Sequence, residues 1–331
     1  MSERVAKVGT EMTAEEMVRR EARSAGEAAQ RGNGGGSSPP SDGQAPSSVA
    51  RRGWGVRLRR WLWLTFVYCL LILGGIIFAM PFLWMVRTAL MDYVQVQKIP
   101  LEWIPRPVRW NNFAEALSFM DFWVLLRNTL IITILAITGQ LLSCSLVAFG
   151  FARLQFPGRE FLFIVLLSTM MLPAMVTEIP RFILFRHFGW IDTFLPLVVP
   201  AFFGAPFFIF LLRQFFKTVP QDLDDAARID GCNSWRIWWQ IMLPLSKPVL
   251  AVVVIFGFIW TWNDFWGPLV YLRTADKKTL SLGLQVFQGI YQTYYHYLMA
   301  ASLVVLAPVL ALYVFCQRYF TQGIVMTGLK G

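Results

Sequence analysis

Between residues 260 and 266 the sequence gathers side chains that could recognise a hydroxylated ring. Asp264 is the single charge in a long apolar stretch, and Asn263 precedes it. A carboxylate and an amide can bind hydroxyl groups, and flat aromatic faces can cover the apolar side of a sugar. The candidate residues for a sugar pathway are Trp260, Trp262, Asn263, Asp264 and Trp266, with Glu178 from an earlier stretch.

These residues also have a purely structural interpretation. The apolar stretch could end near Trp262, which would put Asp264 at the outer membrane interface and the tryptophans in the aromatic belt. Glu178 could pair with Arg181 at the same outer rim. The sequence leaves both interpretations open.

Side chains spaced for catalysis or for a metal ion are not found in the sequence. His187 and His296 stand alone, so we expect both in loops, and the four cysteines lie far apart without a C-x-x-C pair. The phosphate-binding pattern G-x-x-x-x-G-K-[ST] is also missing. We therefore expect no enzyme activity, no metal and no cofactor in this chain.

An acidic loop at residues 217–247 predicts two short helices. Pro220 suits a first helical position, three aspartates complement the positive end of the helix dipole, and Gly231 fits the stop. Ala226 and Ala227 leave a slim surface on which another protein could pack. Ser234 could cap the second helix, which would end at Leu243 and Pro244. The loop is either a docking device or an amphipathic hairpin on the membrane surface.

The elements that must position these residues are membrane spans. Of all residues 56% are hydrophobic and 15% charged, whereas soluble domains carry about 25% charged residues. About 20 apolar residues in a helix cross the bilayer. Six stretches qualify, which predicts an all-α polytopic membrane protein: 61–86, 128–151, 161–177 continuing to Pro180, 193–212, 248–272 and 297–317.

The composition also divides the chain. Residues 1–55 are rich in small and polar residues and predict a disordered cytoplasmic tail, and residues 56–331 are predicted to form a transmembrane domain of six helices. A basic cluster from Arg51 to Arg60 precedes the first span, and more Lys and Arg lie on its side of the membrane than on the other. Both termini are therefore predicted to be cytoplasmic.

The spacing in the 217–247 loop resembles the signature loop of ABC importer permeases, E-A-A-x3-G-x9-I-x-L-P. Other stretches, including Arg127-Asn128-Thr129, Phe151-Ala152-Arg153 and Gln317-Arg318-Tyr319-Phe320, are similar to the maltose-type carbohydrate branch. The resemblance runs from about residue 60 to the end. It implies a six-helix permease whose loop couples to an ATPase through Asp225, Ala226, Ala227, Gly231, Ile241, Leu243 and Pro244.

The resemblance further implies a carbohydrate importer in the bacterial inner (plasma) membrane. Its expected partners are a second permease, two ATPase subunits that bind ATP and Mg, and an extracytoplasmic solute-binding protein or lipoprotein. A self-contained secondary transporter or channel is the alternative. It would need an internal repeat or several charged residues within the spans for ion coupling, and the sequence shows neither clearly.

Overall fold

Helices make up the part of the chain that the structure describes, residues 52–289 and 292–328 of a computed structural model. Strands are absent from these residues, and an isolated antiparallel bridge joins Gln288 to Thr293. The predicted all-α fold is confirmed. The predicted tail lies outside the described residues up to residue 51, as do residues 329–331 at the other end. Helix α2 begins at Arg52, inside the range given to the tail.

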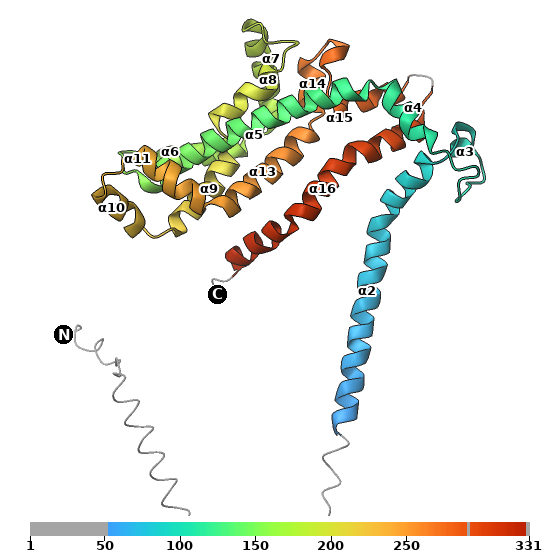
Figure 1. Ribbon diagram of the computed structural model, residues 1–331, viewed down its shortest axis with the longest axis horizontal. Coiled ribbons are helices and arrows are strands. Elements are labelled where there is room, and N and C mark those ends of the chain that lie inside the picture. The colour runs from blue at the N-terminus through green and yellow to red at the C-terminus, as the bar shows by residue number, and fades with distance from the viewer. Residues whose placement is uncertain (1–51, 290–291, 329–331) are drawn as a thin grey trace, which may run out of the picture. The chain divides into compact units, whose positions relative to one another are not determined.

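Figure 1 shows the helices in chain order from blue to red. Their bounds are α2 Arg52–Ala89, α3 Tyr93–Gln97, α4 Asn111–Phe119, α5 Phe122–Arg153, α6 Arg159–Ser168, η1 Thr169–Met171, α7 Ala174–His187, α8 Leu195–Val198, η2 Val199–Phe203, α9 Pro206–Thr218, α10 Asp222–Ile229, α11 Ser234–Arg236, the π-helix η3 Ile237–Met242, α12 Leu243–Leu245, α13 Lys247–Trp262, α14 Trp266–Tyr271, η4 Ala275–Lys277, α15 Leu280–Gly283, η5 Leu284–Phe287 and α16 Tyr295–Gly328.

Four helical segments of the described residues are long and apolar enough to cross a membrane: Arg59–Ala89, Phe122–Arg153, Leu195–Thr218 and Tyr295–Gln317. Two further pairs of helices qualify only when each bent pair is taken as one span. One pair joins Arg159–Met171 to Met175–His187 at 101°, and the other joins Ser234–Leu245 to Lys247–Trp262 at 80°. The described residues therefore hold four to six spans.

Two predicted spans differ from the observed helices. The span predicted to run from residue 161 to Pro180 breaks at Leu172 and Pro173, because proline has no N–H to continue the helix. The span predicted over 248–272 ends at Trp262, and α14 is a separate short helix. The helix therefore ends near Trp262, as the structural interpretation expected of the apolar stretch.

Helix α5 is central to the packing of residues 73–328. It contacts α9, η2 and α13 along its length, and α4 and α10 lie toward its opposite ends (Figure 1). One apolar core surrounds its C-terminal half and contains Phe151, Phe216 and Trp238. A second core lies at its N-terminal end and includes Leu125. At Gly139 the ring of Phe202 comes within 2.5 Å of where a Cβ would stand, so η2 can pack closely only against glycine.

Polar side chains within α5 bond to their own helix. The hydroxyls of Thr129, Thr138, Ser143 and Ser145 each donate to a carbonyl four residues earlier, at 2.5–2.8 Å. These bonds satisfy the hydroxyl groups within the helix, so the side chains need no hydrogen bonds from water in apolar surroundings.

Candidate functional site

Helix α10 forms where the sequence predicts a short acidic helix. Its first hydrogen bonds run from the N–H groups of Asp224 and Asp225 to the carbonyl of Gln221, at 2.9 and 3.1 Å. Asp222 completes an acidic first turn, which complements the helix dipole. Because Gln221 is the N-cap, Pro220 precedes the helix and does not take its first position as predicted.

The predicted stop at Gly231 is confirmed. Its φ is +82°, a left-handed conformation that favours glycine. The N–H of Gly231 donates to the Arg228 carbonyl at 3.0 Å, and the N–H of Cys232 donates to the Ala227 carbonyl at 2.9 Å. The space around a Cβ at residue 231 is open. Backbone conformation, and not crowding, is therefore what calls for glycine here.

A second helical stretch follows, with a different cap from the predicted one. The side-chain oxygen of Asn233 accepts from the N–H of Arg236 at 2.9 Å, while Ser234 is already helical. The cap predicted at Ser234 is thus wrong by one residue. The stretch runs through α11, η3 and α12 to Leu245, beyond the predicted end at Pro244, which lies in the first turn of α12.

The seven positions of the signature pattern lie on two faces of the loop. Ala227, Ile241 and Leu243 pack into the core around Phe151 and Trp238. The outward positions are Asp225, Ala226, Gly231 and Pro244, which are all exposed. The prediction that both alanines offer a docking surface is therefore wrong for Ala227, whose methyl group faces this chain's own core.

A buried ion pair ties α10 to α5. Arg153 Nε lies 3.3 Å from Asp224 Oδ2, and the two side chains are 6% and 4% exposed. Arg153 Nη2 also donates to the carbonyl of Val219 at 2.6 Å. Burial raises the pKa of the Asp224 carboxyl, and the guanidinium of Arg153 opposes that rise. One arginine at the end of α5 therefore holds both the entry to the loop and its first helix.

An open pocket lies beside this ion pair. It has a volume of about 540 Å³ and is lined by Arg153, Leu154, Gln155, Phe156, Gln221 and Arg228. The pocket therefore lies between α10 and the segment that connects α5 to α6.

The predicted pathway residues differ in how far their side chains are already engaged within the chain. Trp262 is 2% exposed, and its Nε1 donates to the Val305 carbonyl at 3.0 Å, joining α13 to α16. Asp264 Oδ1 accepts from the N–H of Gly267 at 3.0 Å at the start of α14. Both side chains therefore have structural partners, which favours the structural interpretation of this stretch.

The other candidates keep exposed surface. Trp260 and Trp266 are each about half exposed, and Asn263 is exposed with its Nδ2 bonded to the Ile259 carbonyl. Glu178 forms an ion pair with Arg181, as the alternative interpretation predicted. A ligand could therefore reach the two tryptophans and Asn263 but not Trp262.

The two histidines lie in helices, which corrects the prediction that they are loop residues. His187 is the last residue of α7, and His296 is buried in α16 beside the rings of Tyr93 and Tyr297. Among the described residues, no group of three or more His, Cys, Asp or Glu side chains could hold a metal ion.

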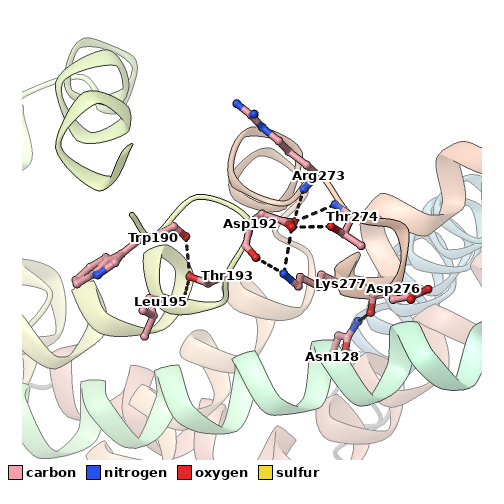
Figure 2. A network of polar contacts seen from close by, with 9 residues as sticks. All are labelled: Asn128, Trp190, Asp192, Thr193, Leu195, Arg273, Thr274, Asp276 and Lys277. Atoms are coloured by element: carbon pink, nitrogen blue, oxygen red, sulfur yellow. Dashed lines mark hydrogen bonds and ion pairs between the residues drawn. The ribbon is translucent and has the colours of Figure 1, made fainter. Parts of the chain in front are cut away.

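A polar network that the sequence analysis did not predict lies near the other end of α5 (Figure 2). The carboxylate of Asp192 accepts from the N–H groups of Arg273 and Thr274, both at 2.9 Å, and from the Thr274 hydroxyl at 2.5 Å. Lys277 Nζ lies 3.1 Å from Asp192 Oδ2 and donates to the Asp192 carbonyl at 2.6 Å. These donors hold the pKa of Asp192 well below its usual range.

Helix α5 joins the same network from below. Asn128 Nδ2 donates to the carbonyls of Asp276 and Lys278 at 2.7 and 3.0 Å. The next residue, Thr129, accepts from the N–H of Leu280 at 2.9 Å. Residues 272–280, here called the 272–280 loop, are thus fixed to α5 and to the turn that carries Asp192.

Some residues of this network were noted in the sequence, but no structural role was predicted for them. Asn128 and Thr129 belong to the stretch Arg127-Asn128-Thr129, which resembles the carbohydrate branch. Asp192 has a φ of 62°, which aspartate tolerates better than most residues. Partners more than 80 residues away along the chain, as for Asp192 and Thr274, leave no local pattern to find.

The sequence matches a family of known proteins. Residues 48–325 match the family model described as binding-protein-dependent transport system inner membrane component. The arabinooligosaccharides transport system permease protein AraQ of Halalkalibacterium halodurans is 37% identical over 70% of this chain and 84% of its own length. The diacetylchitobiose uptake system permease protein NgcG of Streptomyces coelicolor is 32% identical over 76% of this chain and 84% of its own.

A solved structure shows a similar fold. It is the crystal structure of a bacterial ABC transporter involved in the import of the acidic polysaccharide alginate. One of its chains matches with a TM-score of 0.70 and 22% identity, over 84% of this chain and 100% of that chain.

Proposed function

Because the chain belongs to the family of binding-protein-dependent transport system inner membrane components, we propose that it is the permease subunit of an ABC importer that moves a carbohydrate. The curated relatives AraQ and NgcG carry the names of arabinooligosaccharides and diacetylchitobiose, which supports an oligosaccharide as the substrate class. In this role the chain forms half of a translocation pathway in the bacterial inner membrane, as a multi-pass protein with both termini in the cytoplasm.

The observation that carries the proposal is the two-faced 217–247 loop. Its inner face, with Ala227 and Trp238, is part of the apolar core, and Arg153 holds Asp224 beneath it. Its outer face presents Asp225 and Ala226 on a short helix. A small residue beside an exposed acid permits close approach of another protein. We assign this face to the cytoplasmic ATPase subunit.

The partners follow from this assignment. A second permease completes the pathway, two ATPase subunits bind ATP and Mg, and an extracytoplasmic solute-binding protein delivers the sugar. In this scheme the chain itself hydrolyses no ATP. Trp260, Trp266 and Asn263 are the most exposed of the pathway candidates, and Asp264 and Glu178 are partly exposed. Trp262 is buried and is left out of the proposed pathway.

The docking assignment is tested by replacing one exposed alanine. Ala226→Glu places a charge on the proposed contact face and should abolish co-purification of the ATPase subunits and sugar uptake. Ala114→Glu is the matched control. Ala114 is also exposed on a helix, but that helix is α4, which lies toward the opposite end of α5 from α10. Wild-type co-purification and uptake with Ala226→Glu would refute the assignment. Transport by the purified chain alone in vesicles would instead favour a self-contained secondary transporter or channel.

A further inference from the structure

The segment between α3 and α4, residues 98–110, exposes many large apolar side chains. Among its residues these are Ile99, Leu101, Trp103, Ile104, Val108 and Trp110, and Ile99 is 95% exposed. Apolar surface of this extent on a folded chain marks a site that contacts protein or membrane. The depth of the segment relative to the membrane decides between the two.

The 98–110 segment folds back onto the last turns of α2. Arg87 Nε donates to the carbonyls of Glu102 and Trp103 at 3.0 and 3.3 Å. The rings of Trp84 and Trp103 meet edge to face with their centroids 6.0 Å apart, and the guanidinium of Arg87 lies 4.5 Å from the centroid of the Trp84 ring. Trp103 therefore lies at the level of Trp84 and not beyond the end of the helix.

The level of Trp84 follows from the apolar run of α2. Residues 61–86 carry no charge, and Arg87 is the first charged residue after them. As a helix this run is about 39 Å long, whereas the hydrocarbon core is about 30 Å thick. A core centred on the run leaves roughly 4–5 Å, or about three residues, beyond it at each end. Trp84 and its neighbour Trp103 therefore lie at the boundary between hydrocarbon and headgroups, where tryptophan is enriched.

The backbone of the 98–110 segment suits this boundary. Irregular backbone that faces lipid is not tolerated in the hydrocarbon core, because its polar groups find no partners there. In this segment the carbonyls of Glu102 and Trp103 accept from Arg87, and the carbonyl of Arg106 accepts from the side chain of Gln95. The chain thus supplies donors of its own, and headgroups and water are within reach for the groups that remain.

The charge around the segment favours phospholipid. Residues 87–110 carry an excess of positive side chains, with Arg87, Lys98, Arg106 and Arg109 against Asp92 and Glu102. Arginine and lysine beside tryptophan are typical of the membrane interface, and positive side chains attract anionic headgroups.

We propose that the 98–110 segment is an interfacial anchor that inserts into the phospholipid leaflet at the C-terminal end of α2. The side chains of Ile99, Trp103 and Ile104 lie between the headgroups, and Arg87 is the positioning residue that holds the segment at this depth. With the N-terminus in the cytoplasm, this is the outer leaflet. The proposal requires that α2 spans the membrane, and it is independent of the transported substrate and of the ATPase assignment.

The test asks which molecule touches the segment. The photoreactive residue p-benzoylphenylalanine is placed at position 99 or 104 of the complete transporter, which is reconstituted in vesicles of palmitoyl-oleoyl phosphatidylethanolamine and phosphatidylglycerol. After illumination, intact-mass spectrometry separates adducts of these two lipids from adducts of a protein subunit. Both positions should give lipid adducts. Adducts with protein alone, or no adduct at either position, would overturn the proposal.

The positioning role of Arg87 is tested with the probe at position 104. Arg87→Ala should lower the yield of lipid adduct roughly tenfold, the effect of losing a hydrogen bond from a charged donor. Arg273→Ala is the matched control, since Arg273 is an exposed arginine whose backbone N–H, and not its side chain, bonds to Asp192. It should leave the yield unchanged.

Trp84→Leu supplies a second variant in case Arg87→Ala does not assemble, because it keeps an apolar side chain in the span but removes the ring contact with Trp103. An undiminished yield in an assembled Arg87→Ala or Trp84→Leu transporter would show that exposure alone produces the adduct, and the proposal would fail. An equal loss with Arg273→Ala would overturn it as well.

Discussion

Arg153, the last residue of α5, and Asp224, in the first turn of α10, form an ion pair that this chain buries almost completely, with 3.3 Å between Nε and Oδ2. Both groups keep one buried polar atom without a hydrogen bond, Nε of Arg153 and Oδ1 of Asp224. The pair therefore depends on charge more than on hydrogen-bond geometry. Loss of either charge leaves the other one uncompensated.

The first prediction is that Asp224→Asn destabilises the 217–247 loop. Removing one partner of a buried pair costs about 3–5 kcal/mol, because the remaining charge stays buried. Faster proteolysis within residues 217–233 and a lower melting temperature of the purified transporter would show this. Asp222→Asn is the control, since Asp222 is exposed on the same helix. Equal stability of both variants would show that the ion pair contributes nothing.

The second prediction concerns Gly231. Gly231→Val forces a β-branched residue to a φ of +82° and should cost about 1–3 kcal/mol of local strain. ATPase co-purification should weaken while membrane insertion persists. Gly231→Asn should retain most binding, because asparagine tolerates this conformation. A normal Gly231→Val protein would mean that the end of α10 has no role in docking.

A third prediction separates the two interpretations of Asp264. Asp264→Asn keeps an oxygen for the N–H of Gly267, so uptake should stay near wild type. Asp264→Ala removes that acceptor and should lower uptake together with the thermal stability of the transporter. If Asp264→Asn assembles normally but abolishes uptake, the charge itself serves the pathway, and the structural interpretation fails.

The fourth prediction is a pH dependence of the 272–280 loop. The pKa of Asp192 is held low in the folded chain, so its stabilising contribution is complete above the unfolded value of about 3.9 and disappears as the pH falls through the folded pKa. Hydrogen-exchange protection at Thr274 should therefore persist from neutral pH down to about 5. Asp192→Asn should lower the protection already at neutral pH. Loss of protection in the unaltered chain near neutral pH would contradict the role of Asp192.

A fifth prediction is that the purified chain hydrolyses no ATP on its own. The sequence lacks the phosphate-binding pattern, so nucleotide turnover should appear only after the ATPase subunits are added. Phosphate release by this subunit, prepared free of any ATPase, would disprove the assignment.

Local patterns in the sequence predicted most of α10. The acidic first turn, the glycine stop and the second helix follow from the preferences of individual residues, and the errors at Pro220 and Ser234 are of one or two positions. The direction in which Ala227 faces could not be predicted, because it depends on the core that α5 and α9 supply. Whether a small residue such as alanine is buried depends on which other helices pack against it, and the local sequence does not contain that information.

Long-range contacts explain the remaining differences. The break at Pro173 has a local cause, but a continuous apolar run concealed it. Trp262 appeared suitable for a sugar, and only the approach of α16 reveals that its ring is enclosed and its N–H is used by Val305. Asp192 finds its partners more than 80 residues away, a distance over which residue spacing carries no information.

The bend between α6 and α7 restricts what can surround it. Where the helix stops at Leu172 and Pro173, backbone carbonyls of the last turn lose the N–H groups that would follow them. Lipid tails offer no donors, so exposed backbone at membrane depth persists only beside protein or water. Met171, 83% exposed at this break, is open to such a neighbour. If the bent pair crosses the bilayer as one span, the bend marks a position where lipid is replaced by a subunit contact or by solvent.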